Sequence, residues 1–270
     1  MPELPEVETT LRGISPALKG EIVREIRVRN ASLRWPVPDA VQQACGRQVS
    51  GLRRRAKYLL IEIGSGGLLI HLGMSGSLRI CSDEDAVRKH DHFDIVLDSG
   101  AIVRFNDPRR FGAFLWWEAP AEQHVLLRDL GPEPLSDDFS GEYLWLKSRG
   151  RRGPVKNFIM DGRIVVGVGN IYASEALFMC GIHPSRAAGR ISPARYRALA
   201  AAIVDVLERA IRHGGTTLRD YSSSDGTPGY FAQELLAYER EGLPCFRCDT
   251  PMRRKVIGQR SSYYCPGCQR

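Results

Sequence analysis

The chain begins MPELPEVETT, which places a proline directly after the initiator methionine and glutamates close behind it. Removal of Met1 would leave Pro2 with a free secondary amine, whose pKa of about 8 is roughly two units below that of a lysine side chain. A helix beginning here would lower that pKa further, because the partial positive charge of a helix N-terminus opposes protonation. A neutral secondary amine attacks an aldehyde-like carbon to form an iminium ion. Glu3 is adjacent and Glu6 follows on the same helix face, where a carboxyl group can donate or accept the proton.

The same residues also fit ordinary helix initiation, in which proline takes the first helical position and glutamate the first turn. Lys57 is similarly ambiguous. It follows three arginines in RRRAKYLLIEI, where a loop meets a strand, so it can contact a phosphate, sit near a catalytic carboxylate or remain a surface cation. The local sequence leaves these alternatives open.

Two glycine-containing loops offer side chains that suit insertion into a stack of bases. HLGMSGSLRI holds Met74 on a tight turn, and NDPRRFGAF exposes Arg109 and Phe111 after an Asp-Pro turn. Wedges of this kind unstack and kink a nucleic-acid duplex. A single Met or Phe is more often part of a core, and two such loops in a basic protein make insertion only as plausible as that alternative.

A glycine-rich turn, VVGVGNIYASEALF, opens a helix in the second half of the chain. Gly167 and Gly169 let the backbone approach a ligand closely, Asn170 is predicted to cap the helix, and the free amides of a helix start bind anions. The motif lacks the third glycine of a dinucleotide fingerprint. We therefore expect a DNA phosphate as the ligand, with Lys156 as a second contact.

Four cysteines near the C-terminus have the spacing C-x2-C-x16-C-x2-C, namely Cys245, Cys248, Cys265 and Cys268. This spacing is typical of a four-thiolate site for one structural zinc ion. The alternative, two disulfides, is rare inside cells. The segment between the two cysteine pairs carries four cations, Arg253, Arg254, Lys255 and Arg260. They suit a nucleic-acid contact, or they only solvate a structural clasp.

The overall charge favours a polyanionic partner. The formal net charge is +7, and residues 238–270 hold seven basic and three acidic residues, so +4 of it lies in this segment. Clustered positive charge is most often used to bind nucleic acid, although a solvated basic surface is the alternative. The chain has no apolar run near the ~20 residues that span a membrane and no signal peptide. We expect a soluble protein that is not exported.

Hydrophobic periodicity predicts two differently built halves. The first half has short β-branched runs between turn residues, which indicate a sandwich or barrel: IRVRN, YLLIEI, GLLIHLGMSGSLRI, HFDIVLDSG and AIVRFND. Before them, Leu4, Val7, Leu11 and Ile14 have helical spacing, and Gly13 and Pro16 are predicted to end the helix. After a polar break at 130–143, ASEALFMCGI and SPARYRALAAAIVDVLERAIRHGG are helical. We expect domains at 1–130, 131–237 and 238–270.

Taken together, these motifs resemble one family over the full length of the chain. MPELPEVETTLRGI, RRRAKYLL, HLGMSGSLRI, NDPRRFGAF, KNFIMDGRIVVGVGNIYASEALF, DGTPGYFAQELLAY and the four-cysteine segment are similar to bacterial formamidopyrimidine-DNA glycosylases. The resemblance implies an α+β multidomain fold: an N-terminal β-sandwich with an N-terminal helix, a helix-two-turn-helix domain and a zinc finger. It also implies excision of 8-oxoguanine and formamidopyrimidines from duplex DNA, then strand cleavage by β,δ-elimination. A cytoplasmic, nucleoid-associated monomer without membrane contact is expected.

The resemblance also implies roles for particular residues. Pro2 would be the nucleophile, Glu3 the principal acid–base residue, and Glu6 and Lys57 supporting residues. Met74, Arg109 and Phe111 would fill the gap left by the flipped nucleotide, with Arg109 facing the orphaned cytosine. Contacts to DNA would come from His90, Arg109, Lys156, Asn170, Tyr238 and Arg260. A loop from Ser222 to Tyr230, including Thr227 and Gly229, would cover the extruded base.

Two other functions remain open at this point. An endonuclease VIII-like enzyme would prefer oxidised pyrimidines, although Leu4 and the paired HLGMSG and DPRRFG loops favour the purine enzyme. A catalytically silent DNA-binding protein is less consistent with intact Pro2, Glu3 and Lys57.

Overall fold

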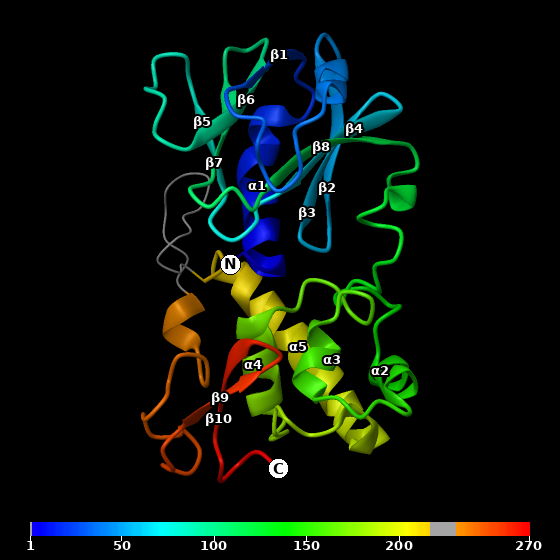
Figure 1. The fold of residues 1–270 in the computed structure, drawn as a ribbon, viewed down its shortest axis with the longest axis vertical. Helices are drawn as coiled ribbons and strands as arrows, with labels where there is room; N and C mark the ends of the chain where they lie inside the picture. The colour runs from blue at the N-terminus through cyan, green and yellow to red at the C-terminus, as the bar shows by residue number, and fades with distance from the viewer. Residues whose placement is uncertain (1, 217–230) are drawn as a thin grey trace. The chain divides into compact units, whose positions relative to one another are not determined.

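The computed structural model describes residues 2–216 and 231–270, and the chain divides into two units. Residues 1–129 and 213–232 form the first unit, and residues 130–212 and 233–270 form the second (Figure 1). The chain therefore leaves the first unit, builds most of the second, and contributes a short segment to the first before ending in the second.

The predicted N-terminal helix is α1 (Leu4–Leu18), and its end differs from the prediction. We expected Gly13 and Pro16 to stop it, but it continues to Leu18, which is 0% exposed in the core of the first unit. Pro16 lies in the last turn, where the missing N–H costs one hydrogen bond and the burial of Leu18 offsets that loss. The inward side of α1, with Val7 and Ile14, packs into the same core.

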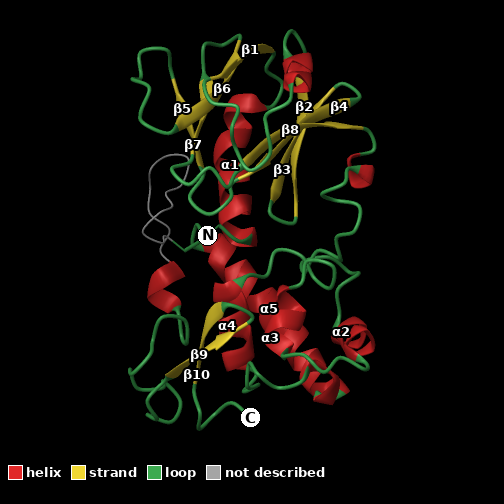
Figure 2. Cartoon of the chain, in the orientation of Figure 1, coloured by secondary structure: helices red, strands yellow, loops and turns green. Residues whose placement is uncertain are grey.

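Two antiparallel four-stranded sheets complete the first unit (Figure 2). One sheet has the order β1-β6-β7-β5, with bounds Val23–Val28, Asp91–Leu97, Ile102–Asn106 and Ser77–Cys81. The other has the order β2-β3-β4-β8, with bounds Val49–Arg55, Tyr58–Ile63, Gly66–His71 and Ala113–Glu118. Both sheets contribute side chains to one apolar core, in which Phe93 stacks on Phe114 with 3.9 Å between ring centroids. The predicted sandwich is confirmed.

Two strands of the first unit were not anticipated from the sequence, β2 and β8. β2 contains three consecutive arginines, a composition that is not typical of a strand. In the fold, Arg53 pairs with Glu62 at 2.9 Å and Arg54 with Glu8 at 3.0 Å. Because these charges are neutralised by neighbours distant in sequence, the strand is stable in a way that local propensity does not predict.

The second unit is helical and ends in a hairpin. Its elements are α2 (Gly141–Ser148), α3 (Val155–Met160), α4 (Asn170–Met179) and α5 (Pro193–Arg212), followed by the paired strands β9 (Arg253–Ile257) and β10 (Arg260–Tyr264). The two helices predicted from periodicity, α4 and α5, are confirmed, and they pack on each other. Among the described helices none combines the length and apolar character of a membrane span.

His71, the last residue of β4, is a half-buried imidazole that the fold keeps neutral. Its Nδ1 accepts the N–H of Gly73 at 3.0 Å, and its ring lies 5.0 Å from that of Tyr58. Burial lowers the pKa of His71 to about 4, and the positive charges of Lys57 and Arg34 act in the same direction. Since only an unprotonated Nδ1 can accept a hydrogen bond, this neutral state shapes the turn that follows β4.

We predict that His71 makes the stability of the protein depend on pH between about 6.5 and 4. Its pKa is lower in the folded chain than the ~6.5 of an unfolded histidine, so its contribution is complete above pH ~6.5 and is lost as the pH falls through the folded value. The slope for one proton is at most ~1.4 kcal/mol per pH unit. In urea unfolding at pH 6.5 and 4.5, the wild type should lose more stability than His71→Asn, which keeps an acceptor but cannot be protonated.

Equal losses of stability in the wild type and in His71→Asn would contradict this prediction.

Asp91 also has a different pKa in the folded chain than in the unfolded chain. Burial acts to raise its pKa, but the Arg79 and Asn106 side chains and the Arg88 N–H outweigh burial and lower the pKa to about 2. The effect of Asp91 belongs to pH values below about 4, outside the window in which His71 titrates.

Candidate functional site

The N-terminus of α1 holds the predicted nucleophile and its two glutamates in one buried cluster. Pro2 is buried, and Glu3 and Glu6 are 1% and 2% exposed. The Glu6 carboxylate accepts the N–H of Glu3 at 2.7 Å, and the Glu3 side chain accepts the N–H of Glu6, so the two form a capping box. The arrangement that starts the helix thus fixes the backbone that directly follows Pro2. Helix initiation and the predicted active site are compatible descriptions of the same residues.

Glu6 also joins this cluster to a segment that is distant in sequence. Its Oε1 accepts the N–H of Thr216 at 2.9 Å, while Oε2 accepts that of Glu3. Gly215 has a positive φ of 81° and comes so close that an added Cβ would lie 3.2 Å from Glu6. The Phe231 N–H donates to the Gly215 carbonyl at 3.2 Å. One carboxylate therefore holds both the helix start and residues 215–216.

Lys57 lies in the two-residue turn between β2 and β3. The preceding Ala56 has a φ of +55°, and its carbonyl accepts a hydrogen bond from Arg54 Nη1 at 2.9 Å. The same guanidinium donates from Nε to Glu8 of α1 at 3.0 Å. Arg54 thus fastens the turn to the helix that carries Pro2, and Figure 1 shows the turn at the same end of the first unit as the N-terminus. The sequence indicated Arg54 only as part of a basic cluster, and this positioning role was missed.

The two predicted wedge loops form one surface. Gly73, with a φ of +66°, lies against the other loop so tightly that an added Cβ would be 2.4 Å from the carbonyl carbon of Phe111. Phe111 is 43% exposed, and the Arg109 guanidinium lies 5.1 Å from the centre of its ring. Met74 is half-buried. An exposed Phe111 on a rigid turn is available for contact with a ligand, which the alternative of a core phenylalanine would not allow.

In the second unit, Lys156 is entirely enclosed by protein. It is 0% exposed, and its Nζ donates to Asn170 Oδ1 at 2.7 Å, Ser262 Oγ at 2.8 Å and the Ser261 carbonyl at 3.2 Å. Lys156 therefore links α3, the start of α4 and the β9–β10 hairpin. Arg260, the first residue of β10, is exposed at the hairpin turn. The prediction that Asn170 caps α4 is wrong, because Gly169 takes that position and the Asn170 side chain faces Lys156.

Tyr238 is held by a buried carboxylate that the sequence did not single out. Glu175 in α4 is 2% exposed and accepts the N–H groups of Leu236, Ala237 and Tyr238 at 2.8, 2.9 and 2.8 Å. Burial raises the pKa of Glu175, and the three N–H donors act against that rise. The Tyr238 ring contacts Tyr263 of β10 edge-on at 5.1 Å. The signal in the sequence was the single charged residue of a mostly apolar helix.

The four cysteines form a site that fits one zinc ion. Their Sγ atoms all lie within 4.8 Å of one another, and three pairs are 3.3, 3.5 and 3.9 Å apart. Zinc–sulfur bonds of ~2.3 Å in a tetrahedron require sulfur atoms about 3.8 Å apart, whereas a disulfide needs about 2.05 Å. The backbone N–H groups of Arg247 and Cys268 donate to Sγ atoms of the set at 3.4 Å, which favours thiolates.

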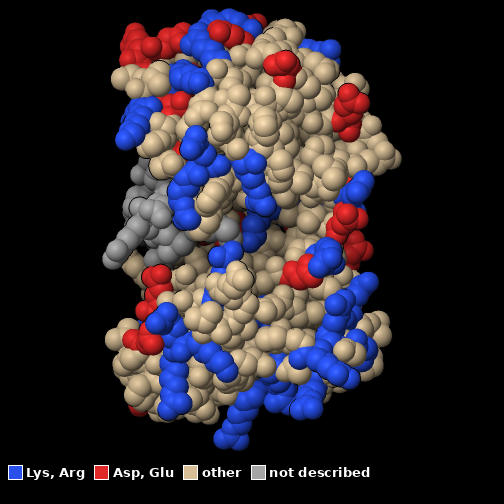
Figure 3. Space-filling model, viewed as in Figure 1, with Lys and Arg blue, Asp and Glu red and all other residues tan. Residues whose placement is uncertain are grey.

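The zinc module, defined as residues 242–270, packs on α4. Phe178 of α4 joins Met252, Cys245 and Cys265 in a small apolar core. Arg247 donates to the carbonyls of Phe178 and Met179 at the end of the helix, at 3.2 and 3.1 Å. Four exposed cations of the module lie on β9 and at the hairpin turn: Arg253, Arg254, Lys255 and Arg260. Figure 3 shows Lys and Arg side chains gathered over the parts of the second unit that hold this hairpin and α2.

The predicted loop that covers the extruded base lies outside the described residues. This applies to Ser222, Thr227, Gly229 and Tyr230. His90, in contrast, is described: it is half-buried in the first unit and has a φ of +74°, which is uncommon for a residue with a side chain.

Comparison with known proteins covers the whole chain. Residues 1–114 match the formamidopyrimidine-DNA glycosylase N-terminal domain, residues 130–222 the formamidopyrimidine-DNA glycosylase H2TH domain, and residues 242–270 a zinc finger found in FPG and IleRS. The chain is 60% identical, over 100% of both chains, to the formamidopyrimidine-DNA glycosylase of Alcanivorax borkumensis. It is also 60% identical to that of Syntrophotalea carbinolica over 100% of both chains.

Solved structures agree with the sequence relatives. The MutM (Fpg) protein of Thermus thermophilus is 37% identical with a TM-score of 0.89, over 99% of this chain and 98% of that one. The Fpg of Lactococcus lactis, solved in complex with DNA that contains an abasic site, is 29% identical with a TM-score of 0.92 over 99% of both chains. With a proline at a capped helix start, a β-sandwich, a helical unit and a four-cysteine zinc site, the chain belongs to the formamidopyrimidine-DNA glycosylase family.

Proposed function

We propose that this enzyme removes oxidised purines from duplex DNA in base excision repair, using the amine of Pro2 as its nucleophile, and then cleaves the strand. The observation that carries the proposal is the buried capping box of Glu3 and Glu6 at the helix N-terminus that directly follows the buried Pro2. Structures of the Lactococcus lactis protein with DNA containing an abasic site or N7-benzyl-Fapy-dG support this substrate class.

The chemistry follows from a secondary amine at the sugar. Pro2 attacks the anomeric carbon, the bond to the damaged base breaks, and an iminium ion forms with proton transfer through Glu3. The iminium makes the neighbouring C–H of the sugar acidic, so the 3′ phosphate leaves by β-elimination. A second elimination releases the 5′ phosphate and leaves a one-nucleotide gap. A single nucleophile therefore accounts for both base excision and strand cleavage, while Glu6 fixes the helix start and Lys57 acts near the lesion or its phosphate.

The base must leave the helix before it can be reached. Flipping costs a few kcal/mol in unpairing and unstacking, and side chains inserted into the gap offset that cost. In this proposal Met74, Arg109 and Phe111 fill the gap, and Arg109 faces the orphaned cytosine. His90 contacts the backbone beside them. The loop that includes Ser222, Thr227, Gly229 and Tyr230 covers the extruded base.

In the second unit the proposed phosphate contacts are Asn170, Tyr238 and Arg260. We assign Lys156 to positioning these groups instead of touching a phosphate itself, because its amine faces Asn170 and β10. Zinc, bound by the four thiolates, stabilises the module and takes no part in the reaction.

The proposal also includes the domain organisation and the state of the protein. The domains end at residues 130, 237 and 270, and the enzyme acts as a monomer associated with the nucleoid.

We predict that borohydride will trap this protein on abasic-site DNA, because reduction of the iminium gives a stable crosslink. Pro2→Gly retains only a primary amine and should trap more weakly. Glu3→Gln should lower base excision at least about 100-fold, the usual contribution of a general acid–base residue, while some abasic-site cleavage persists. Full excision by Glu3→Gln would rule out its role, and failure of the wild type to crosslink would indicate a silent DNA-binding protein.

The choice of substrate is tested with the same wild-type preparation. Excision of 8-oxoguanine opposite cytosine should exceed that of thymine glycol in matched duplexes under single-turnover conditions. A strong preference for thymine glycol would favour the endonuclease VIII-like alternative.

We predict that Lys156→Met and Arg260→Gln weaken DNA binding for different reasons. Removing the Lys156 amine leaves buried acceptors without their donor, which should cost about 1–3 kcal/mol of stability and weaken binding similarly at all salt concentrations. Arg260→Gln should leave stability unchanged and reduce the slope of log affinity against log salt by about 1. Fluorescence titrations at several salt concentrations separate the two, and their stoichiometry should be one chain per duplex.

A lower salt slope for Lys156→Met, equal to that of Arg260→Gln, would mean that Lys156 itself contacts a phosphate. Two chains per duplex would contradict the proposed monomer.

We predict that removal of zinc will reduce DNA binding more than it disturbs the fold. The cysteines pack against α4 in the second unit, and the core of the first unit contains none of them. Chelation should therefore abolish most of the affinity while circular dichroism retains the β-sheet signal of the first unit. Unchanged affinity after complete zinc release would show that the module is a structural clasp only.

A further inference from the structure

Asp107 occupies the junction of the two wedge loops and is 0% exposed. Its carboxylate accepts three hydrogen bonds. Oδ1 accepts from Ser75 Oγ at 2.6 Å and from the Arg109 N–H at 3.2 Å, and Oδ2 accepts from the Gly112 N–H at 2.8 Å. Ser75 belongs to the loop with Met74, while Arg109 and Gly112 flank the turn with Phe111. One carboxylate therefore binds both loops.

The backbone of Asp107 reaches a third segment. Its N–H donates to the carbonyl of His90 at 3.0 Å, and its carbonyl accepts from His92 Nε2 at 2.7 Å. Because a carbonyl only accepts, Nε2 of His92 must carry a proton. His90, which has the positive φ, is thus tied to the wedge loops through Asp107.

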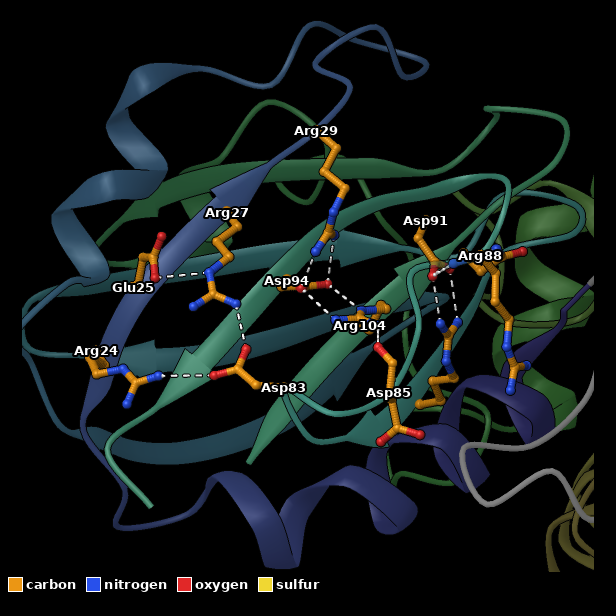
Figure 4. A network of polar contacts seen from close by, with 12 residues as sticks. Arg24, Glu25, Arg27, Arg29, Asp83, Asp85, Arg88, Asp91, Asp94 and Arg104 are labelled. Atoms are coloured by element: carbon orange, nitrogen blue, oxygen red, sulfur yellow. Dashed lines mark hydrogen bonds and ion pairs between the residues drawn. The ribbon is translucent and has the colours of Figure 1, made fainter. Parts of the chain in front are cut away.

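The His90 side of this junction is itself braced. Asp91 accepts both Arg79 Nη groups at 2.9 and 2.6 Å, the Arg88 N–H at 2.7 Å and Asn106 Nδ2 at 2.8 Å. Figure 4 shows Asp91 with Arg88 at the start of β6, a central strand of the β1-β6-β7-β5 sheet. Asp91 and Asp107 therefore flank His90 and fix it to the strands.

We propose that Asp107 is a positioning residue that holds the two wedge loops as one rigid unit and thereby sets discrimination of the base opposite the lesion. The inference rests on the proposed insertion of Met74, Arg109 and Phe111. Asp107 touches no reacting atom. Its two carboxylate oxygens make the Met74 turn and the Arg109–Phe111 turn move together, and insertion into a base stack requires such preorganisation because a loose wedge loses conformational entropy on binding.

The location of Arg109 links this brace to specificity. The Arg109 N–H is shared between Asp107 Oδ1 and Ser75 Oγ, at 3.2 and 3.3 Å. Its guanidinium lies over the Phe111 ring, 5.1 Å from the ring centre, and in the proposed function this group faces the orphaned cytosine. If the backbone of Arg109 is released, its side chain can reach more than one geometry, and hydrogen bonds that distinguish cytosine from adenine weaken relative to nonspecific contacts.

The test uses single-turnover excision of 8-oxoguanine by the full-length enzyme. Asp107→Asn keeps the shape but replaces one acceptor oxygen by an NH2 group, which cannot accept from Ser75 or Gly112. It should slow excision opposite cytosine at least tenfold and reduce the ratio of excision opposite cytosine to that opposite adenine at least threefold. Ser75→Ala removes one of the three bonds to the carboxylate and the second acceptor of the Arg109 N–H, and it should cause a smaller change in the same direction.

A matched control is Asp85→Asn. Asp85 accepts the N–H and Oγ of Ser82 at 2.8 and 3.2 Å in an exposed turn outside the wedge loops. The same chemical change there should leave both the rate and the ratio unchanged. If Asp107→Asn does not fold, as judged by its thermal melt, Ser75→Ala decides the question alone.

Measuring Asp107→Asn in two backgrounds, the wild type and a variant without the wedge side chains, separates positioning from a general loss of stability. In a protein that already carries Met74→Ala, Arg109→Ala and Phe111→Ala, Asp107→Asn should slow excision less than twofold further, because there is no wedge left to align. An equal slowing in both backgrounds, or an unchanged opposite-base ratio, overturns the inference. If the triple variant excises as fast as the wild type, the proposed insertion itself fails, which is a different result.

Discussion

The two hydrogen bonds that the Glu6 carboxylate accepts are the interactions on which the proposed active site depends. The carboxylate accepts one N–H from the start of α1 and one from residue 216, and it is almost completely buried. A buried carboxylate is costly unless its oxygens are hydrogen-bonded, and two backbone donors meet that requirement. The same bonds fix Pro2 at a helix N-terminus and bring residues that follow α5 back into the first unit. The same carboxylate therefore caps α1, fixes the position of the proposed nucleophile and holds the segment that returns to the first unit after α5.

Buried polar groups recur behind several of the residues that we propose to contact DNA. Glu175 holds the backbone of Tyr238, Lys156 holds Asn170 and β10, and Asp107 holds the wedge loops. Each makes at least three hydrogen bonds, so its desolvation is offset. The residues proposed to meet DNA lie on turns and helix starts, which are the least rigid parts of a fold. A buried group with several bonds supplies the rigidity that those turns lack.

The basic character of the chain is used in two different ways. In β2, Arg53 pairs with Glu62 and Arg54 with Glu8, so that run of arginines stabilises the first unit. The cations of the β9–β10 hairpin are exposed, although Arg254 also pairs with Glu241 at 2.8 Å. Charge clustering in the sequence favoured a polyanionic partner, but it did not distinguish cations that build the fold from cations that remain exposed.

The sequence by itself determined the family, the sandwich followed by helices, and the four-cysteine zinc site, because each of these depends on residue types at fixed local spacing. Pro2 and its glutamates could also be singled out, since one helical turn brings them together. Tertiary structure alone decided that α1 runs past Pro16, that Arg54 orients the Lys57 turn, that Lys156 is enclosed, and that Asp107 joins two loops more than 30 residues apart. These features depend on partners distant in sequence, and the energy of a buried hydrogen bond or ion pair is set by such partners and by burial, neither of which local spacing encodes.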